Sequence, residues 1–101
     1  MGEALRTAGT EPSRRDEEAL ELGRKVLAIQ AAIENPEARD AMGAITDLGL
    51  DARHYMMVRG WLSEQLRADR SVRDAYQGQA PARIEERIEF LQRAIRAIDL
   101  E

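Results

Sequence analysis

The stretch AITDLGLDARHYMMVRGWLSEQLRADRSV, residues 44–72, concentrates several residue types that are rare in this chain. It contains the only Trp, the only His, one of the two Tyr and two of the four Met. Its apolar residues recur at steps of three or four, as on one helix face: Tyr55, Val58, Leu62 and Leu66. Met57 and Trp61 widen this stripe on one side, whereas Met56 lies off it. We therefore interpret the stretch as the helix that fills the centre of a bundle, with Met56 as an exposed contact residue.

The residues before this stretch predict two further helices. An acidic cluster at Asp16 suits a helix N-terminus, and Asn35-Pro36 ends that helix because the residue before a proline is pushed out of the α region. The apolar stripe of this first helix follows the same spacing: Ala19, Leu22, Val26, Ile29 and Ile33. A short second helix is expected from Pro36 to Leu48, closed by Gly49 in the left-handed conformation. Asp51 is then expected as the N-cap of the central helix.

The residues after the central stretch predict a break and one long final helix. Ser71 and Asp74 match a capping box, so we expect a kink near Asp69 and a short helix that ends at Gly78. Pro81 starts the last helix, whose apolar residues have coiled-coil spacing: Ile84, Ile88, Leu91, Ile95 and Ile98. This seam lasts about two and a half heptads, short of the three or four that are typical of a coiled coil.

These patterns predict an all-α fold, a bundle of four or five mostly antiparallel helices over residues 16–101, after a disordered lead-in at residues 1–15. The first and last helices carry matching stripes that can pack on each other within one chain. Alternatively, the seam of the last helix can pair with a second copy in a weak homodimer. We favour the monomer.

Composition excludes several classes of protein. The chain has 101 residues and no Cys, so disulfides and Cys-based metal centres are excluded. No apolar run is long enough to cross a membrane, and residues 1–18 do not have the pattern of a signal peptide. Residues 1–50 carry six basic and ten acidic side chains, and residues 51–101 carry nine of each. This balance argues against nucleic-acid binding, which depends on a basic surface.

No combination of residues carries a catalytic signature. His54 is the only histidine, so a metal site would need several carboxylate ligands beside it. Ser63 lies nine residues further along the same expected helix, about 13 Å away, which is too far for a catalytic pair. We therefore expect no catalytic residue, no metal and no cofactor, and we favour a protein that is not an enzyme.

Two functions remain open. The leading one is a non-catalytic helical protein-interaction or assembly module, which uses Met56 or the seam of the last helix: Ile84, Ile88, Leu91 and Ile95. The alternative is a small helical enzyme or sensor that binds an anionic metabolite. Its candidate residues are Arg53, Arg59 and Arg67, because arginine binds carboxylates and phosphates in a bidentate manner. The chain has fourteen Arg and one Lys, a ratio that a GC-rich genome also produces.

Part of the chain resembles a bacterial domain-of-unknown-function family, number forty-one sixty-eight. The resemblance covers residues 19–76, including the segment ALELGRKVLAIQAA, and matches a pattern of caps and apolar positions: Ile45, Gly49, Leu50, Tyr55, Leu66, Asp69 and Val72. It implies a small helical protein and a periplasmic or surface setting, because many members carry export signals. Without it, a cytoplasmic setting is expected. It implies no catalytic residue and no ligand.

Overall fold

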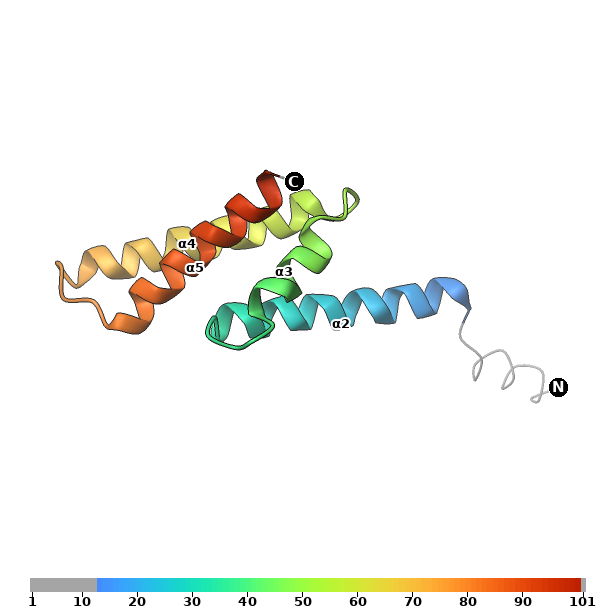
Figure 1. Cartoon of the computed structure of the whole chain (residues 1–101), viewed down its shortest axis with the longest axis horizontal. Coiled ribbons are helices and arrows are strands. Elements are labelled where there is room, and N and C mark those ends of the chain that lie inside the picture. The colour runs from blue at the N-terminus through green and yellow to red at the C-terminus, as the bar shows by residue number, and fades with distance from the viewer. Residues whose placement is uncertain (1–12, 101) are drawn as a thin grey trace.

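The computed structural model describes residues 13–100, and this part of the chain forms four helices (Figure 1). In chain order they are α2 (Arg14–Glu34), α3 (Ala41–Gly49), α4 (Tyr55–Ala75) and α5 (Ala82–Asp99). The predicted all-α fold is confirmed. Of the predicted lead-in, residues 1–12 lie outside the described part.

Helix α2 begins at Arg14, two residues earlier than predicted. Ser13 is the reason, because its hydroxyl accepts a hydrogen bond from the backbone N–H of Asp16, at 3.2 Å. The Asp16 carboxylate accepts one from the Ser13 N–H in return, which completes a capping box. The helix ends at Glu34, directly before Asn35-Pro36, as predicted.

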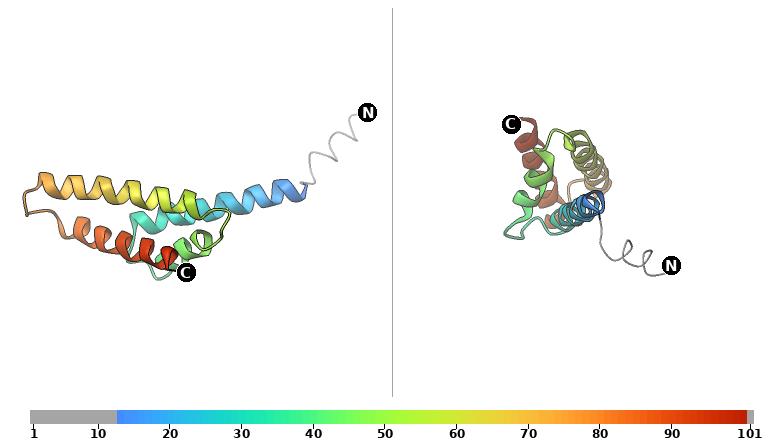
Figure 2. Two further views of the ribbon diagram at one scale, coloured as in Figure 1. Left: turned by 90° about the horizontal axis from the view of Figure 1, so that it is seen from above. Right: turned by 90° about the vertical axis from the view of Figure 1, so that its right-hand side faces the viewer.

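The four helices form a hairpin to which a second, smaller unit is attached. Helices α4 and α5 run antiparallel, side by side, whereas α2 packs mainly on α3 (Figures 1 and 2). Helix α3 contacts both members of the hairpin and so joins the two units. The N-terminal end of α2 projects beyond the other helices (Figure 2).

The core lies where these helices meet, and the buried apolar residues come from all four. They are Ile29, Ala32, Ala41, Ile45, Leu48, Val58, Leu62, Leu66, Ile84, Ile88, Phe90, Leu91, Ala94 and Ile98. The central stripe of α4 and the seam of α5 are thus confirmed as core, except that Tyr55 and Ile95 are only half-buried. Phe90 and Ala94 are buried beside the seam.

The first and last stripes do not pack on each other, so the predicted packing of these two helices within one chain is wrong. The seam of α5 is covered by α4 instead. On α2, only the C-terminal part of the predicted stripe reaches the core: Ile29 is buried, Leu22, Val26 and Ile33 are half-buried, and Ala19 is exposed. The reason is the projection of α2 beyond its neighbours.

Helix α4 is continuous from Tyr55 to Ala75, which corrects two predictions. Its N-cap is His54 rather than Asp51, whose carboxylate instead accepts a hydrogen bond from the Arg53 backbone N–H in the preceding turn. There is no break near Asp69 and no separate fourth helix, because Asp69 is itself a buried residue of the inner face. The chain turns at Gln77 and Gly78, which both have positive φ.

Helix α3 starts at Ala41 rather than at Pro36, and Gly49 is its last residue rather than a left-handed cap. Gly49 has a different function, which is to allow close packing. A Cβ atom built at this position would lie 2.7 Å from Ile98 Cγ2 and 3.3 Å from Val58 Cγ1. Both neighbours are buried side chains with little room to move.

We expect Gly49→Ala to lower the free energy of unfolding by about 1–3 kcal/mol, because the added methyl group overpacks the core. Gly43→Ala is the matched control in the same helix, since a Cβ there meets nothing within 4 Å. It should stabilise by about 0.5–1 kcal/mol through helix propensity. Urea denaturation measures both changes. Equal effects of the two substitutions would contradict a role of Gly49 in close packing.

Candidate functional site

A groove of about 950 Å³ lies between α4 and α5. Along α4 it extends from Arg59 to Asp74, a span of about 22 Å at 1.5 Å per residue. We call it the α4–α5 groove. It is lined by Arg59, Ser63, Leu66, Arg67, Arg70, Ser71, Asp74, Gln92, Ile95, Arg96, Asp99 and Leu100.

At one end of the α4–α5 groove, a polar cluster ties the start of α4 to the end of α5. Arg59 Nε lies 3.0 and 3.1 Å from the two carboxylate oxygens of Asp99, and the Tyr55 hydroxyl donates to the same carboxylate. The Tyr55 hydroxyl and the Arg59 guanidinium lower the pKa of Asp99, and the hydrogen bond to Asp99 raises the pKa of Tyr55. Arg59 also donates to Ser63 Oγ. Arg59 is therefore neutralised within the molecule.

The other arginines of the α4–α5 groove differ in their partners. Arg67 forms an exposed ion pair with Glu64 at 3.1 Å. Arg70 and Arg96 have no ion pair among the described residues. The sequence-based selection of Arg53, Arg59 and Arg67 did not include these two, because the residues that pair with an arginine depend on side-chain geometry.

Arg53, the third predicted anion-binding residue, lies away from the groove in the turn before α4. Its Nε and Nη2 atoms donate to the two carboxylate oxygens of Asp51, at 3.2 and 3.0 Å. The structure thus places Arg59 and Arg67 on one groove and Arg53 elsewhere. The three arginines do not converge on one site.

The pKa of Asp51 provides a test of the Arg53 contact. The Arg53 side chain, and then its backbone N–H, lower this pKa from 3.8 to about 2. Because the folded pKa lies below the ordinary value, the stabilising effect is complete above pH 3.8 and is lost as the pH falls toward 2. We expect the Asp51 carboxyl carbon to titrate near 2 by NMR, and to move toward 3.8 in Arg53→Ala. An unchanged midpoint in that variant would refute the contact.

A buried ion pair links α4 to α5 on the inner side of the hairpin. Asp69 is only 2% exposed, and both its carboxylate oxygens accept hydrogen bonds of 2.7 Å from Arg87. Gln65 donates a third hydrogen bond to Asp69 at 3.0 Å. The bond to Asp69 raises the pKa of Arg87. Because both carboxylate oxygens are engaged and Asp69 is buried, this cluster supports the fold.

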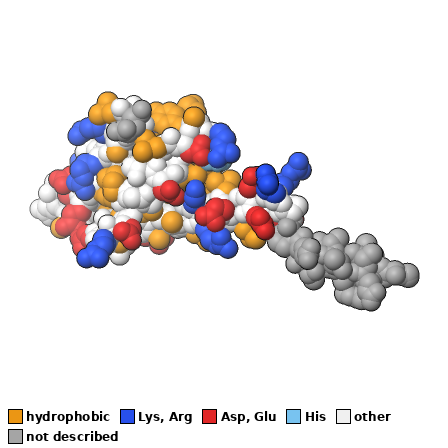
Figure 3. Space-filling view, turned by 45° about the vertical axis from the view of Figure 1, so that its right-hand side comes forward, with side chains coloured by type: hydrophobic (Ala, Val, Ile, Leu, Met, Phe, Trp, Pro, Cys, Tyr) orange, Lys and Arg blue, Asp and Glu red, His pale blue; other side chains and the backbone are white. Residues whose placement is uncertain are grey.

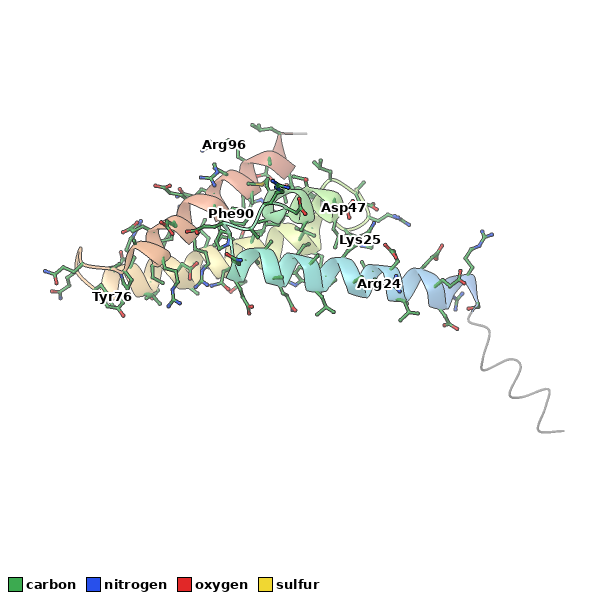
Figure 4. The ribbon with its side chains drawn as sticks, turned by 60° about the horizontal axis from the view of Figure 1, so that its bottom comes forward. Arg24, Lys25, Asp47, Tyr76, Phe90 and Arg96 are labelled. Atoms are coloured by element: carbon green, nitrogen blue, oxygen red, sulfur yellow. The ribbon has the colours of Figure 1, made fainter. Side chains whose placement is uncertain are left out.

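The second candidate surface is the side of α2 that faces away from the core. Leu20 and Leu27 are 58% and 65% exposed there, and Ala31 continues the same line at helical spacing. We call this line the outer face of α2. On the opposite side of the helix, Ile29 and Ala32 are buried, and Lys25 forms an ion pair with Asp47 of α3 at 3.7 Å (Figure 4). Helix α2 is therefore apolar on two sides.

The residues that the sequence predicted as protein contacts differ in how far they are exposed. Met56 is 78% exposed, Ile95 is half-buried in the lining of the groove, and Ile84, Ile88 and Leu91 are buried in the core. Because these last three side chains pack within the chain, they are not available to a partner protein. On the face shown in Figure 3, acidic and basic side chains are interspersed, with hydrophobic side chains exposed between them.

His54 is half-buried, and among the residues that the structure describes no cluster of three or more His, Asp or Glu is arranged to hold a metal ion. None of the four described helices combines the length and the apolar character that a membrane span requires.

Comparisons with known protein families, with curated proteins and with solved structures find no match for this chain. The resemblance to the domain-of-unknown-function family forty-one sixty-eight therefore stays a prediction.

Proposed function

We propose that the chain is a non-catalytic helical protein-interaction module that binds a partner protein through the outer face of α2. The observation that carries this proposal is that α2 is apolar on two sides, of which the core uses one. A helix at the surface of a monomer normally has a single apolar stripe and a polar opposite side. Single exposed leucines need no explanation, but Leu20 and Leu27 lie on the same side of α2 as Ala31, with Arg24 between the two leucines.

Site-specific photocrosslinking in the cells of origin tests this function. A photoreactive amino acid at position 27 should give a covalent adduct with another polypeptide on irradiation, and so should one at position 20. Position 83 is the matched control, because Arg83 is exposed on α5 and lies outside both candidate surfaces. Absence of adducts from positions 20 and 27 would refute the proposed function, and equal adducts from position 83 would show random contact.

The alternative, an anionic metabolite bound by arginines, has less support from the geometry. Small-molecule sites usually enclose most of the ligand surface, whereas the α4–α5 groove is open along its length. Arg53, Arg59 and Arg67 are each already paired with a carboxylate. A thermal-shift screen of carboxylates and phosphates tests it, since a ligand at about 100 times its Kd stabilises by about 2.7 kcal/mol. No shift at millimolar concentration would eliminate this alternative.

A further inference from the structure

We infer that the outer face of α2 of one molecule docks into the α4–α5 groove of a second copy. This inference rests on the proposed function, because it names the partner of the same face of α2. It accounts for two separate surface features of the chain by one contact.

The outer face of α2 is flanked mainly by acidic side chains. Asp16 and Glu17 lie one helical turn before Leu20, and Glu34 lies one turn after Ala31. Arg24 is the basic residue beside this line, and it forms an ion pair with Glu21 at 2.8 Å. The face therefore presents exposed leucines with a net negative charge.

The α4–α5 groove has the opposite charge. Four arginines and two aspartates line it, and Asp99 already neutralises Arg59. Of the four arginines that line the groove, Arg70 and Arg96 are the two with no ion pair among the described residues. Both are exposed on the surface, and Figure 4 shows Arg96 on α5, well separated from Arg24 on α2.

The two surfaces also agree in length and in apolar character. The outer face of α2 from Leu20 to Ala31 spans about 17 Å, and the α4 side of the groove from Arg59 to Asp74 spans about 22 Å, so the face fits within the length of the groove. Ile95, which is half-buried, and Leu100, which is 77% exposed, supply apolar surface within the groove. A helix laid along the groove would thus place leucines against apolar side chains and acids against arginines, the arrangement of an amphipathic helix in a groove.

Pairing of α2 with α2 of a second copy is less favourable. It would bring Asp16, Glu17 and Glu34 of each molecule against a surface of the same net charge, and like charges that face each other across an interface oppose binding. The groove is therefore the better partner for this helix.

Because the two surfaces are different and lie apart on the molecule, the contact is heterologous. Each copy can offer its α2 to one neighbour and its groove to another, which produces a chain of molecules or a closed ring. Self-association should then grow with concentration and weaken with added salt, since salt screens the exposed charges.

Sedimentation of the full chain and of variants in each surface tests the inference. Leu27→Glu places a charge on the outer face of α2 and should prevent this face from docking. The double variant Arg70→Glu/Arg96→Glu reverses two charges in the groove and should prevent the groove from accepting the helix. Each should weaken self-association by about tenfold or more, the effect of losing about 1.4 kcal/mol of binding. These side chains are exposed, so circular dichroism should show that both variants stay folded. Arg83→Glu is the control for a change of charge outside both surfaces.

Mixing the two variants gives the decisive result. Leu27→Glu retains an intact groove, and the arginine double variant retains an intact α2. An equimolar mixture should therefore form a complex of one molecule of each and no larger assembly. A wild type that stays monomeric at millimolar concentration would overturn the inference, and so would self-association that survives in the arginine variant. If the protein is monomeric but position 27 crosslinks to a different protein, the proposed function holds and only this inference fails.

Discussion

Asp69→Ala is expected to lower the free energy of unfolding by about 3–5 kcal/mol, the cost of removing one partner from a buried ion pair. The substitution leaves the Arg87 guanidinium, which is 23% exposed, without the two hydrogen bonds of 2.7 Å that it donates to Asp69. Gln65 loses its acceptor as well. Because Arg87 retains some contact with water, we expect a value near the lower end of the range. Urea denaturation of the two proteins gives the difference directly.

A double variant separates the ion pair from simple packing. Asp69→Leu/Arg87→Met replaces both charges by apolar side chains, and such replacements are often neutral or stabilising. We expect this variant to be close to the wild type in stability. Arg67→Ala is the control for an exposed ion pair and should change stability by less than about 1 kcal/mol. If the double variant were as unstable as Asp69→Ala, the loss would come from the packing around position 69 and not from the unpaired charge.

Asp69 also explains why the continuity of α4 could not be predicted. Local sequence rules treat an acid in an apolar stripe as the end of that stripe, and Ser71 with Asp74 then matched a helix start. The true partner of Asp69 is Arg87, eighteen residues away on the next helix. Nothing in the local pattern identifies such a pair, because it depends on how two helices meet.

The regular parts of the fold could be predicted because their signals are local. The helix end before Asn35-Pro36 and the seam of α5 both follow from spacing and from backbone restrictions. The sequence correctly placed the end of α3 at Gly49, but it attributed this glycine to a left-handed cap. Its close approach to Ile98 is a tertiary contact, so the sequence alone favoured the commoner use of glycine as a left-handed cap.

The candidate surfaces were less predictable than the core. A search for one stripe on α2 assigned Ala19 and Leu22 to the buried side and passed over Leu20 and Leu27. Only the position of α3 decides which side of α2 is covered. Similarly, arginine was recognised as the residue type of interest, but its partners could not be read from spacing, so Arg70 and Arg96 were missed.

Leu91→Ala is expected to lower the free energy of unfolding by about 2–5 kcal/mol, through loss of apolar burial and creation of a cavity. Leu91 is fully buried on α5, in the core that this helix shares with α4. Leu50→Ala is the matched control, because the same atoms are removed from a residue that is 46% exposed and belongs to neither candidate surface, and it should cost far less than Leu91→Ala. Urea denaturation at several protein concentrations measures both. A loss for Leu91→Ala that is independent of concentration supports a core residue within one chain, whereas a loss below about 0.5 kcal/mol would place the seam of α5 at the surface. A loss that grows as the protein is concentrated would instead make Leu91 part of a contact between copies, because association stabilises the folded state by mass action.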